Sequence, residues 1–518
     1  MKKFVVLTCM AAIGASAMAQ DTFSNNEFVN NAGDVHGTAR FVGMGGAMGA
    51  LGADISVMGW NPAGIGLMRR STFSLTSGAA WSQKGIEEKG TTNATLDQMG
   101  FVYNLELDDT DVPYINIGLN YQKKRDFNGA FYADNMNLAG LSQMSQLAGI
   151  ANAGFDTGDN LAGMAVDNGF LTAFDANGNA IEASDKTPIH HFGNNFKGTS
   201  NFYTQYSSGY LSEFDINISS NIQDRYYWGI TFSIENLRYR GFADYFEKSV
   251  NPKTKNAGDY SVYNDHAIDG VGFNLKVGGI VRPFEDSPLR IALVAEIPTW
   301  YQLKKSTFFN MTDNVDKFRT HDIESYLEYS IRTPFKFRAG VGSTVSNFLA
   351  WDVDYEFANY RSTAMGYPDT YVDDPNSSIF NNTWDKAMNE NTKRNLKPVH
   401  NVRAGLEFKP DPAVAFRVGY NYATTACKDN VSFSQVDLDS YAMNKATSTS
   451  FMRLGDVHSV NLGVGFNWKY AFLDFAYKLK SQKADFYAFD SNDQGGKLDP
   501  VNVDLTRHQI TATLGFKF

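Results

Sequence analysis

The C-terminal stretch 510–518 reads ITATLGFKF and alternates between apolar side chains and small or polar ones. One face of the stretch carries Ile510, Ala512, Leu514, Phe516 and Phe518, and the other carries Thr511, Thr513, Gly515 and Lys517. A period of two predicts a β-strand with one apolar face, because successive side chains of a strand point to opposite sides.

The same alternation recurs throughout the chain from Ser71 onward. It is clear at 115–121 (INIGLNY), at 228–235 (WGITFSIE) and at 460–468 (VNLGVGFNW). A water-soluble β-sandwich shows this pattern too, so alternation by itself does not identify the solvent on the apolar side.

The connections between strands distinguish the two kinds of fold. Strands are expected at 71–82, 95–105, 113–125, 209–221, 225–240, 264–282, 289–303, 322–345, 348–360, 396–409, 413–424, 455–468, 470–481 and 505–518. The range 322–345 is taken as one strand kinked at Pro334, since proline is tolerated at a bulge but not in a regular ladder. Long and short connections then alternate without exception, as in a transmembrane barrel with short turns at one end and long loops at the other. The sequence therefore predicts an all-β fold, a closed antiparallel transmembrane β-barrel of fourteen strands over residues 71–518.

A barrel in lipid has to close on itself and face its apolar sides outward, because unpaired edge groups are costly in hydrocarbon. The polar faces of the expected strands, which would then line the lumen, carry Arg290, Glu296, Lys336, Arg338, Asp352, Asp354, Glu356, Arg403, Glu407, Arg417, Asp474 and Lys478. The simplest interpretation of these charges is that they pair with one another and hydrate the lumen.

Composition excludes several classes of protein. Aromatic residues make up 14% of the chain and charged residues 20%, which does not fit a disordered chain. The formal net charge of −10 argues against a nucleic-acid partner. No Ser/His/Asp or Cys/His arrangement indicates an enzyme, and no cofactor is expected.

The N-terminus has the order of a secretory signal peptide. Lys2 and Lys3 precede the apolar run 4–13, and Ala17-Met18-Ala19 provides a cleavage site. We therefore expect residues 1–19 to be a signal peptide. Cys427 is then the only cysteine left, which excludes an intramolecular disulfide.

Residues 20–70 do not alternate and contain a glycine-rich run, GMGGAMGALG at 43–52, followed by Asn61-Pro62-Ala63-Gly64. A phosphate-binding G-x-G-x-x-G loop does not fit, because Met48 occupies the position of the third glycine and no strand precedes the run. An even strand number places the start of the first strand at the short-turn end, so this segment can fold back into the lumen. We expect it to form an N-terminal hatch, with Gly43, Gly45, Gly46, Asn61, Pro62, Ala63 and Gly64 as its characteristic residues.

The stretch 37–47 (GTARFVGMGGA), together with Asn61-Pro62-Ala63-Gly64, resembles the FadL/TodX family of outer-membrane transporters for long-chain fatty acids and other hydrophobic compounds. It is most similar to variants labelled hemin receptor. The resemblance implies a plugged barrel in the outer membrane of a Gram-negative bacterium, in contact with outer-membrane lipid. The terminal Phe518 likewise resembles the insertion signal that barrel-assembly machinery recognises.

The connection 126–208 is long enough to suggest a function of its own. Its apolar residues fall into two groups that we interpret as short amphipathic helices: Leu138, Leu141, Met144, Leu147 and Ile150, then Leu161, Met164, Phe170, Leu171 and Phe174. Two interpretations remain open. The apolar residues form an external groove that captures a hydrophobic ligand, or they pack on each other and cap the barrel.

The sequence supports passive transport of a hydrophobic small molecule, with a local defect in the wall as one exit route and Gly118 in the third strand as its candidate position. A scaffold that binds a protein partner, or a hemin receptor, are the alternatives. His190-His191 lies in the long connection, and Asp108-Asp109-Thr110-Asp111 and Asp373-Asp374 form acidic runs. Without a second ligand cluster or EF-hand spacing, we read the histidines and the acidic runs as solvated and expect no metal site.

Overall fold

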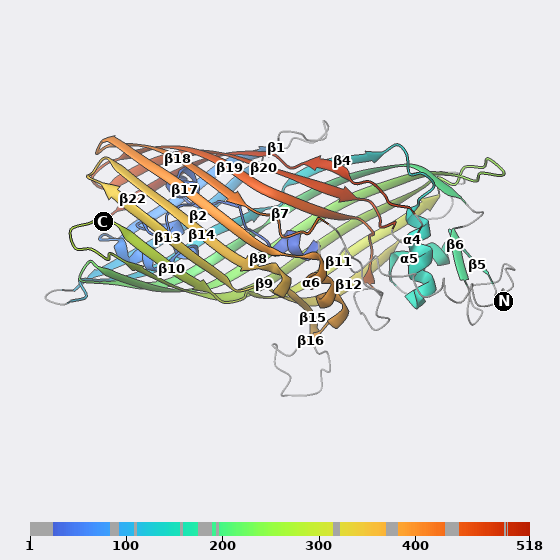
Figure 1. The fold of residues 1–518 in the computed structure, drawn as a ribbon, viewed down its shortest axis with the longest axis horizontal. Coiled ribbons are helices and arrows are strands. Elements are labelled where there is room, and N and C mark those ends of the chain that lie inside the picture. The colour runs from blue at the N-terminus through green and yellow to red at the C-terminus, as the bar shows by residue number, and fades with distance from the viewer. Residues whose placement is uncertain are drawn as a thin grey trace.

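A closed antiparallel barrel of fourteen strands forms the body of the molecule (Figure 1). The structure is a computed structural model, and it describes residues 24–82, 93–107, 111–155, 159–174, 189–192, 196–313, 322–368, 382–429, 445–491, 494 and 496–518. The predicted signal peptide lies outside these residues.

Strands that run through the wall without a break are β1 (Thr72–Ser82), β2 (Asn93–Glu106), β7 (Lys197–Ile222), β8 (Tyr226–Val250), β9 (Tyr260–Val281), β17 (Pro398–Asp411), β18 (Val414–Ala423), β19 (Phe451–Asn467) and β20 (Ala471–Tyr487). The other wall strands are interrupted pairs: β3 (Tyr114–Asp126) with β4 (Gly129–Asn135), β10 (Arg290–Glu296) with β11 (Trp300–Asp313), β12 (Ile323–Arg332) with β13 (Lys336–Val345), β14 (Leu349–Asn359) with β15 (Ala364–Pro368), and β21 (Val501–Asp504) with β22 (Arg507–Lys517). The barrel closes where β22 pairs with β1, with Leu514 opposite Leu75.

The remaining elements lie inside the barrel, at its loop end or beside its wall. They are α3 (Ala39–Gly43), η2 (Ile55–Gly59), η3 (Pro62–Leu67), α4 (Gln143–Ile150), η4 (Ala151–Phe155), α5 (Leu161–Asp167), β5 (Leu171–Phe174), β6 (Ile189–Phe192), η6 (Tyr360–Ser362), β16 (Asn382–Trp384) and α6 (Lys386–Asn395). Among the described residues, no helix is both long and apolar enough to span a membrane.

Each of the fourteen predicted strand positions is confirmed, including the kink at Pro334. The gap between β12 and β13 spans 333–335, and the neighbouring strand breaks at the same height, where Pro298 separates β10 from β11. Backbone and side-chain hydrogen bonds between Thr299 and Thr333 bridge the two breaks, at 3.0 and 2.8 Å. The break at Pro298 was not predicted, because a single proline near a strand centre looks like a local bulge until its neighbour is seen to break with it.

The predicted connection 126–208 is wrong at both ends, because β4 and the first part of β7 occupy much of it. Strand β8 shows why these extensions were missed. Before Asn236, in the half of the strand nearer the short turns, the exposed side chains are apolar (Trp228, Ile230, Phe232). After Asn236, toward the loop end, the exposed side chains are polar (Arg238, Asp244, Lys248). The buried face changes in the opposite sense, from Thr231 and Ser233 to Leu237 and Tyr239. The strand keeps its period of two, but the side chains on its outward face change from apolar to polar.

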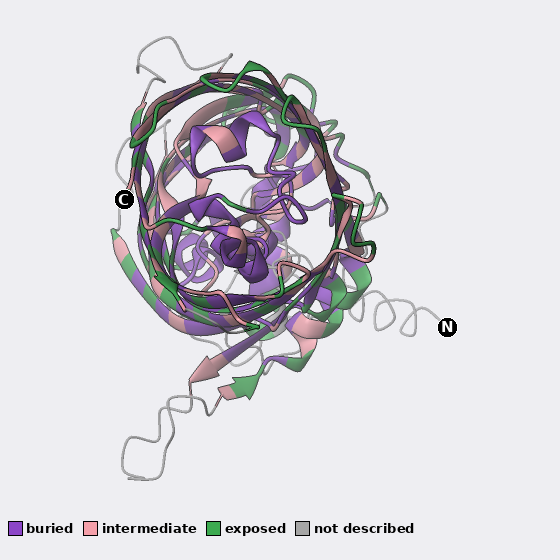
Figure 2. Cartoon of the chain, turned by 90° about the vertical axis from the view of Figure 1, so that its left-hand side faces the viewer, coloured by how far each residue is buried: buried purple, intermediate pink, exposed green. Residues whose placement is uncertain are grey.

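The outer face of the barrel therefore carries an apolar band at the short-turn half, with exposed side chains such as Leu293, Phe337, Leu462 and Leu514. The inward-facing side chains are polar in the short-turn half of the barrel and apolar in the loop-end half. Figure 2, seen from the short-turn end, shows buried segments within the ring of strands. These include residues 24–70, here termed the luminal segment.

Candidate functional site

The luminal segment is held in shape by short helices whose caps are supplied by its own side chains. Thr38 caps α3 by accepting a hydrogen bond from the Phe41 amide at 3.2 Å, and its hydroxyl donates to Asp54 at 2.8 Å. Asn61 caps η3 by accepting from the Ala63 amide at 3.1 Å, with Pro62 at the first helical position. The Asn-Pro-Ala-Gly motif is thus a helix start, where proline costs no hydrogen bond.

Glycines on both partners allow the segment to touch the wall backbone to backbone. Gly45 and Gly46 have φ of +66° and +75°, a conformation that side chains disfavour. Opposite them, a Cβ at Gly419 of β18 would lie 2.1 Å from the Gly45 nitrogen, and one at Gly463 of β19 would lie 3.2 Å from the Gly43 Cα. The glycine run is therefore a packing surface rather than a ligand loop.

Two buried carboxylates of β14 accept hydrogen bonds from the segment. Asp352 accepts from the amides of Ala50 at 2.9 Å and Leu51 at 2.7 Å. Asp354 accepts from the Gly49 amide and from the Trp60 indole, both at 2.8 Å. Buried main-chain amides need hydrogen-bond partners, and these two carboxylates supply them, so the pair anchors the segment to the wall.

Inward-facing cations of the wall anchor it as well. Arg338 lies 4.4 Å and Arg403 3.5 Å from the centre of the Trp60 ring, so the indole sits against two guanidinium groups. Arg338 also donates to the Trp60 carbonyl at 3.1 Å, and Lys478 donates to the Val35 carbonyl at 2.6 Å.

The lumen charges were predicted to pair with one another and to hydrate the lumen. Some do pair, such as Arg417 with Glu407 and Asp474, but several hold the luminal segment instead. The sequence carried no signal for this role, because the partners are main-chain groups some 300 positions away in the chain.

The apolar residues of the long connection lie in one buried cluster at the loop end of the barrel, where α4 and α5 are found (Figure 1). Leu138, Leu141, Met144, Leu147, Ile150, Leu161, Met164, Phe170 and Leu171 are all at most 9% exposed, and they pack with wall residues such as Tyr203, Tyr239 and Tyr260. In this state they form a closed cap rather than an open groove.

The helical interpretation holds for α4 and α5. It is wrong for Leu138 and Leu141, which precede α4, and for Phe170, Leu171 and Phe174. Gly169, at φ +67°, follows the end of α5, and Leu171 and Phe174 belong to strand β5. Glycine commonly ends a helix in this conformation. The Phe174 side chain lies outside the described part of the structure.

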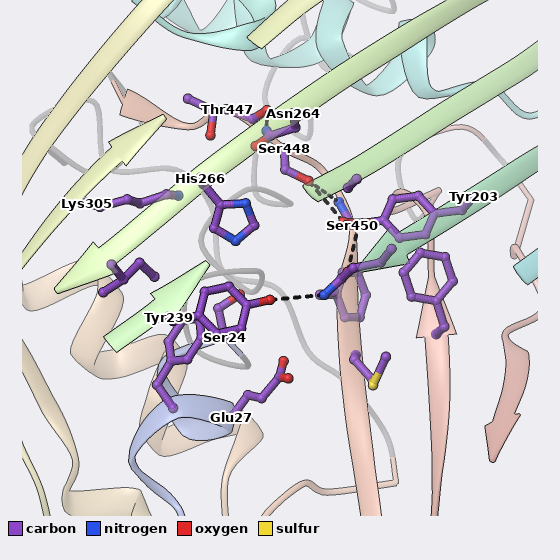
Figure 3. Close-up of a pocket in the computed structure, with 17 residues that line it drawn as sticks. Ser24, Glu27, Tyr203, Tyr239, Asn264, His266, Lys305, Thr447, Ser448 and Ser450 are labelled. Carbon is purple, nitrogen blue, oxygen red and sulfur yellow. Dashed lines mark hydrogen bonds between the residues drawn. The ribbon is translucent and has the colours of Figure 1, made fainter. Parts of the chain in front are cut away.

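A cavity of about 80 Å³ lies beside the start of the luminal segment, between it and the wall (Figure 3). Its lining is mixed: aromatic rings of Phe28, Tyr203, Tyr239 and Phe486 stand beside polar side chains that include Glu27, Asn264, His266 and Ser450. In Figure 3, Glu27 and His266 face the same space from opposite sides. Sequence reasoning missed this cavity, whose residues come from the N-terminus, the wall and the loop after β18.

Gly118 does not mark a gap in the wall. The ladder runs without a break through it on both sides, to Val102 of β2 and to Asn217 of β7. A Cβ at Gly118 would lie 2.2 Å from the Met58 methyl group, so the luminal segment packs directly on this position.

The third strand is interrupted further along, between β3 and β4. The β2–β3 ladder ends at Gln98 and Gln122, so that 93–97 and 123–126 each pair on one side only among the described ladders. Gly209 of β7, at φ +115°, faces the break and accepts a hydrogen bond from the Phe127 amide at 3.0 Å. A recess of about 320 Å³, lined in part by Asn93, Asn128 and Gly129, lies beside it.

Ion pairs cross the lumen side of this interruption. Asp126 accepts from Lys123 at 3.2 Å and from Arg507 at 2.9 Å, and Lys123 lies 3.9 Å from Asp97. His36 of the luminal segment lies 3.6 Å from Asp97. The interruption and the luminal segment are thus connected by one charge network.

The candidate metal and haem ligands receive little structural description. His190 and His191 lie in β6, paired with β5, but their side chains are outside the described part of the structure, as are Asp108, Asp109, Asp373 and Asp374. Within the described residues, no group of three or more His, Cys, Asp or Glu side chains could hold a metal ion.

Comparison with known proteins gives a match in structure alone. No protein-family model and no curated protein matches the sequence. The CymD monoaromatic hydrocarbon channel covers 94% of this chain and 98% of its own, with a TM-score of 0.50 and 10% identity. A FadL homologue from Pseudomonas aeruginosa covers 94% and 99%, with a TM-score of 0.52 and 12% identity.

The toluene transporter TbuX of Ralstonia pickettii is similar to the same extent, covering 93% of this chain and 98% of its own with a TM-score of 0.50 and 14% identity. The chain has the FadL-type barrel fold. The resemblance inferred from the hatch motif is confirmed at the level of fold.

Proposed function

We propose that this FadL-type barrel is a passive outer-membrane channel for hydrophobic small molecules, and that the luminal segment is its hatch. The observation that carries the proposal is the change of lining inside the barrel. Apolar side chains line the loop-end half of the lumen, while the luminal segment fills the polar half below it. A water-filled pore would need neither an apolar chamber nor a plug.

The apolar band on the outer face supports residence in a bilayer, since charged side chains on a lipid-facing surface are costly. Together with the signal peptide proposed for residues 1–19 and the insertion signal proposed at Phe518, the band supports our proposal that the barrel resides in the outer membrane of a Gram-negative bacterium. No enzymatic activity is part of the proposal. The similar structures are named as channels and transporters, which agrees with transport.

Entry would pass through the cap formed by α4 and α5. Burial of apolar surface stabilises a hydrophobic molecule by about 25 cal/mol per Å². Opening the cap would expose Leu141 and Met144 to an arriving ligand, and methionine adapts to ligands of different shape. The predicted groove is therefore retained as a proposal for an open state of the cap.

Exit would use the interrupted third strand rather than Gly118. A hydrophobic molecule gains nothing from crossing the polar half of the lumen, whereas the β3–β4 break lies near the top of the ladder that faces the apolar chamber. Separation of the Asp97–Lys123–Asp126 ion pairs would open this route sideways. Transport would then need no ATP, because the concentration gradient and the partitioning of the cargo supply the driving force.

The decisive experiment is uptake by purified barrel in proteoliposomes, with radiolabelled toluene and a radiolabelled long-chain fatty acid as alternative cargoes. We expect the barrel to accelerate entry of at least one of them over protein-free liposomes. Organic extraction of the gently purified protein, followed by mass spectrometry, should return an apolar molecule. A barrel that accelerates neither cargo and co-purifies with a stoichiometric protein partner would favour the scaffold alternative.

A further inference from the structure

The cavity beside the luminal segment carries polar groups that have no partner among the described residues. Asn264 donates its side-chain N–H to the Thr447 carbonyl at 2.6 Å, which leaves its buried Oδ1 without a partner. The Thr447 hydroxyl and His266 Nδ1 are likewise buried without a partner among the described residues. All three residues line the cavity (Figure 3).

The neighbouring polar side chains are, in contrast, mutually satisfied. Tyr203 donates to Gln205 at 3.0 Å, Gln205 donates to Tyr239 at 3.1 Å, and the hydroxyls of Ser448 and Ser450 lie 2.9 Å apart. The unmet groups are therefore specific to one side of the cavity. A buried polar group left without a hydrogen bond is costly, so these positions call for an occupant.

The unmet groups define the chemistry of that occupant. Asn264 Oδ1 can only accept a hydrogen bond, while the Thr447 hydroxyl can both donate and accept. A ligand hydroxyl matches both, because it donates to the first and accepts from the second. An ether oxygen and a carboxylate lack the donor. The cavity lining includes one acidic side chain, Glu27, and one basic side chain, Lys305, and so favours neither sign of ligand charge.

The volume of about 80 Å³ is small compared with the roughly 150 Å³ cavity that encloses benzene. The cavity is large enough for the polar head group of a longer ligand, whose apolar chain would then lie along the aromatic rings.

We propose that this cavity binds the hydroxyl head of an uncharged amphiphilic alcohol. The inference rests on the proposed function as a channel for hydrophobic molecules and narrows its cargo to molecules with one hydrogen-bond donor. Asn264 and Thr447 are the residues that select the head group, and the aromatic rings hold the body.

The test compares three probes with the same chain: 1-octanol, 1-methoxyoctane and octanoate. Binding to the full-length barrel in lipid nanodiscs is measured by saturation-transfer NMR, with empty nanodiscs subtracted. We expect 1-octanol to bind about tenfold more tightly than 1-methoxyoctane, the effect of one buried hydrogen bond, and octanoate to bind more weakly still.

Asn264→Leu and Thr447→Val should each remove most of the preference for 1-octanol, whereas Asn310→Leu, on β11 outside the cavity, should leave it unchanged. Thr447→Val keeps the shape of the side chain and the Thr447 carbonyl that Asn264 uses, so it tests the site even if Asn264→Leu fails to fold. Equal binding of alcohol and ether, or a preference that survives both variants, would overturn the inference.

Proteoliposome uptake separates this inference from the proposed function. Toluene uptake without a preference for the alcohol would support the channel and contradict the alcohol site. Absence of all uptake would contradict both proposals.

Discussion

At the scale of single residues, the luminal segment depends on a few contacts that no other side chain can make. Trp60 combines an indole hydrogen bond to Asp354 with ring contacts to Arg338 and Arg403. Buried aromatic rings near guanidinium groups gain from both packing and the ring quadrupole. These contacts tie the segment to the wall at one point.

Trp60→Ala should destabilise the docked segment by about 3–5 kcal/mol, the usual cost of truncating a buried aromatic ring. Trp60→Phe keeps the ring contacts and loses the indole N–H, so it should cost clearly less. Limited trypsin digestion of the folded barrel, scored at Arg40, measures the effect. Equal digestion of Trp60→Ala and the parent protein would show that the segment is held elsewhere.

Gly419→Val should displace the luminal segment, because its Cβ would meet the Gly45 backbone at 2.1 Å. The barrel itself should still close, so ion conductance in planar bilayers should rise. Gly279→Ala is the matched control, since a Cβ there meets only the Tyr227 carbonyl, at 3.8 Å. If both variants conduct like the parent protein, the glycine contact is not what seats the segment.

The pH response of the segment is expected to centre on His36. Burial lowers its pKa to about 4, and the charge of Lys478 acts in the same direction, while Asp97 opposes them. The folded state therefore binds fewer protons than the undocked one, whose histidine titrates near 6.5. The stabilisation is complete above about pH 6.5 and is lost as the pH falls toward 4, up to about 3 kcal/mol in all.

Burial raises the pKa of Asp54 and Glu27, so protonation of these two groups stabilises the docked segment and opposes the effect of His36. For this reason the contribution of His36 is measured as the difference between the parent protein and His36→Gln. Amide hydrogen exchange of the segment, corrected for the intrinsic pH dependence of exchange, should rise between pH 6.5 and 4 more steeply in the parent protein than in His36→Gln. Superimposable pH profiles for the two proteins would assign the response to the carboxyl groups.

At the scale of elements, each strand of the wall serves two environments in succession. In β8 the outward face changes from apolar to polar above Asn236, and the inward face changes in the opposite sense. The strands thus mark the upper edge of the apolar band without any change of period. The interrupted third strand lies close to this level, where a side opening would meet the bilayer surface.

Substitutions on the outer face should report where the band ends. Leu462→Arg, within the band of β19, should destabilise the barrel in lipid vesicles by about 2–4 kcal/mol. Tyr132→Arg, equally exposed on β4 but beyond the band, should cost about 0–1 kcal/mol. Reversible urea unfolding in vesicles gives both values, and similar costs for the two variants would argue against the proposed position of the bilayer.

At the scale of the whole molecule, the barrel and the luminal segment stabilise each other. The wall supplies inward carboxylates and guanidinium groups, and the segment supplies the amides, carbonyls and indole that satisfy them. Without the segment, Asp352 and Asp354 would lose the amide and indole donors that they bind in the docked state. The segment thus fills the polar half of the lumen, and the packed apolar cluster fills the loop-end half.

Much of this architecture was predictable because alternation is a local property. A strand between lipid and a polar lumen has to alternate wherever it crosses the bilayer, so all fourteen strands were found, together with the buried glycine-rich segment in front of them. The Asn-Pro-Ala-Gly motif and the helices α4 and α5 were also visible, since capping and helical spacing involve only neighbouring residues.

Tertiary structure alone decided the contacts that join distant parts of the chain. The roles of Asp352, Asp354 and Gly118, the cavity between Glu27 and His266, and the break in the third strand depend on register between strands and on where the luminal segment comes to rest. Those positions follow from closure of the barrel, which brings residues hundreds of positions apart within hydrogen-bond distance. The alternation of side chains therefore determined the wall, and the packing of the segment inside it determined the candidate site.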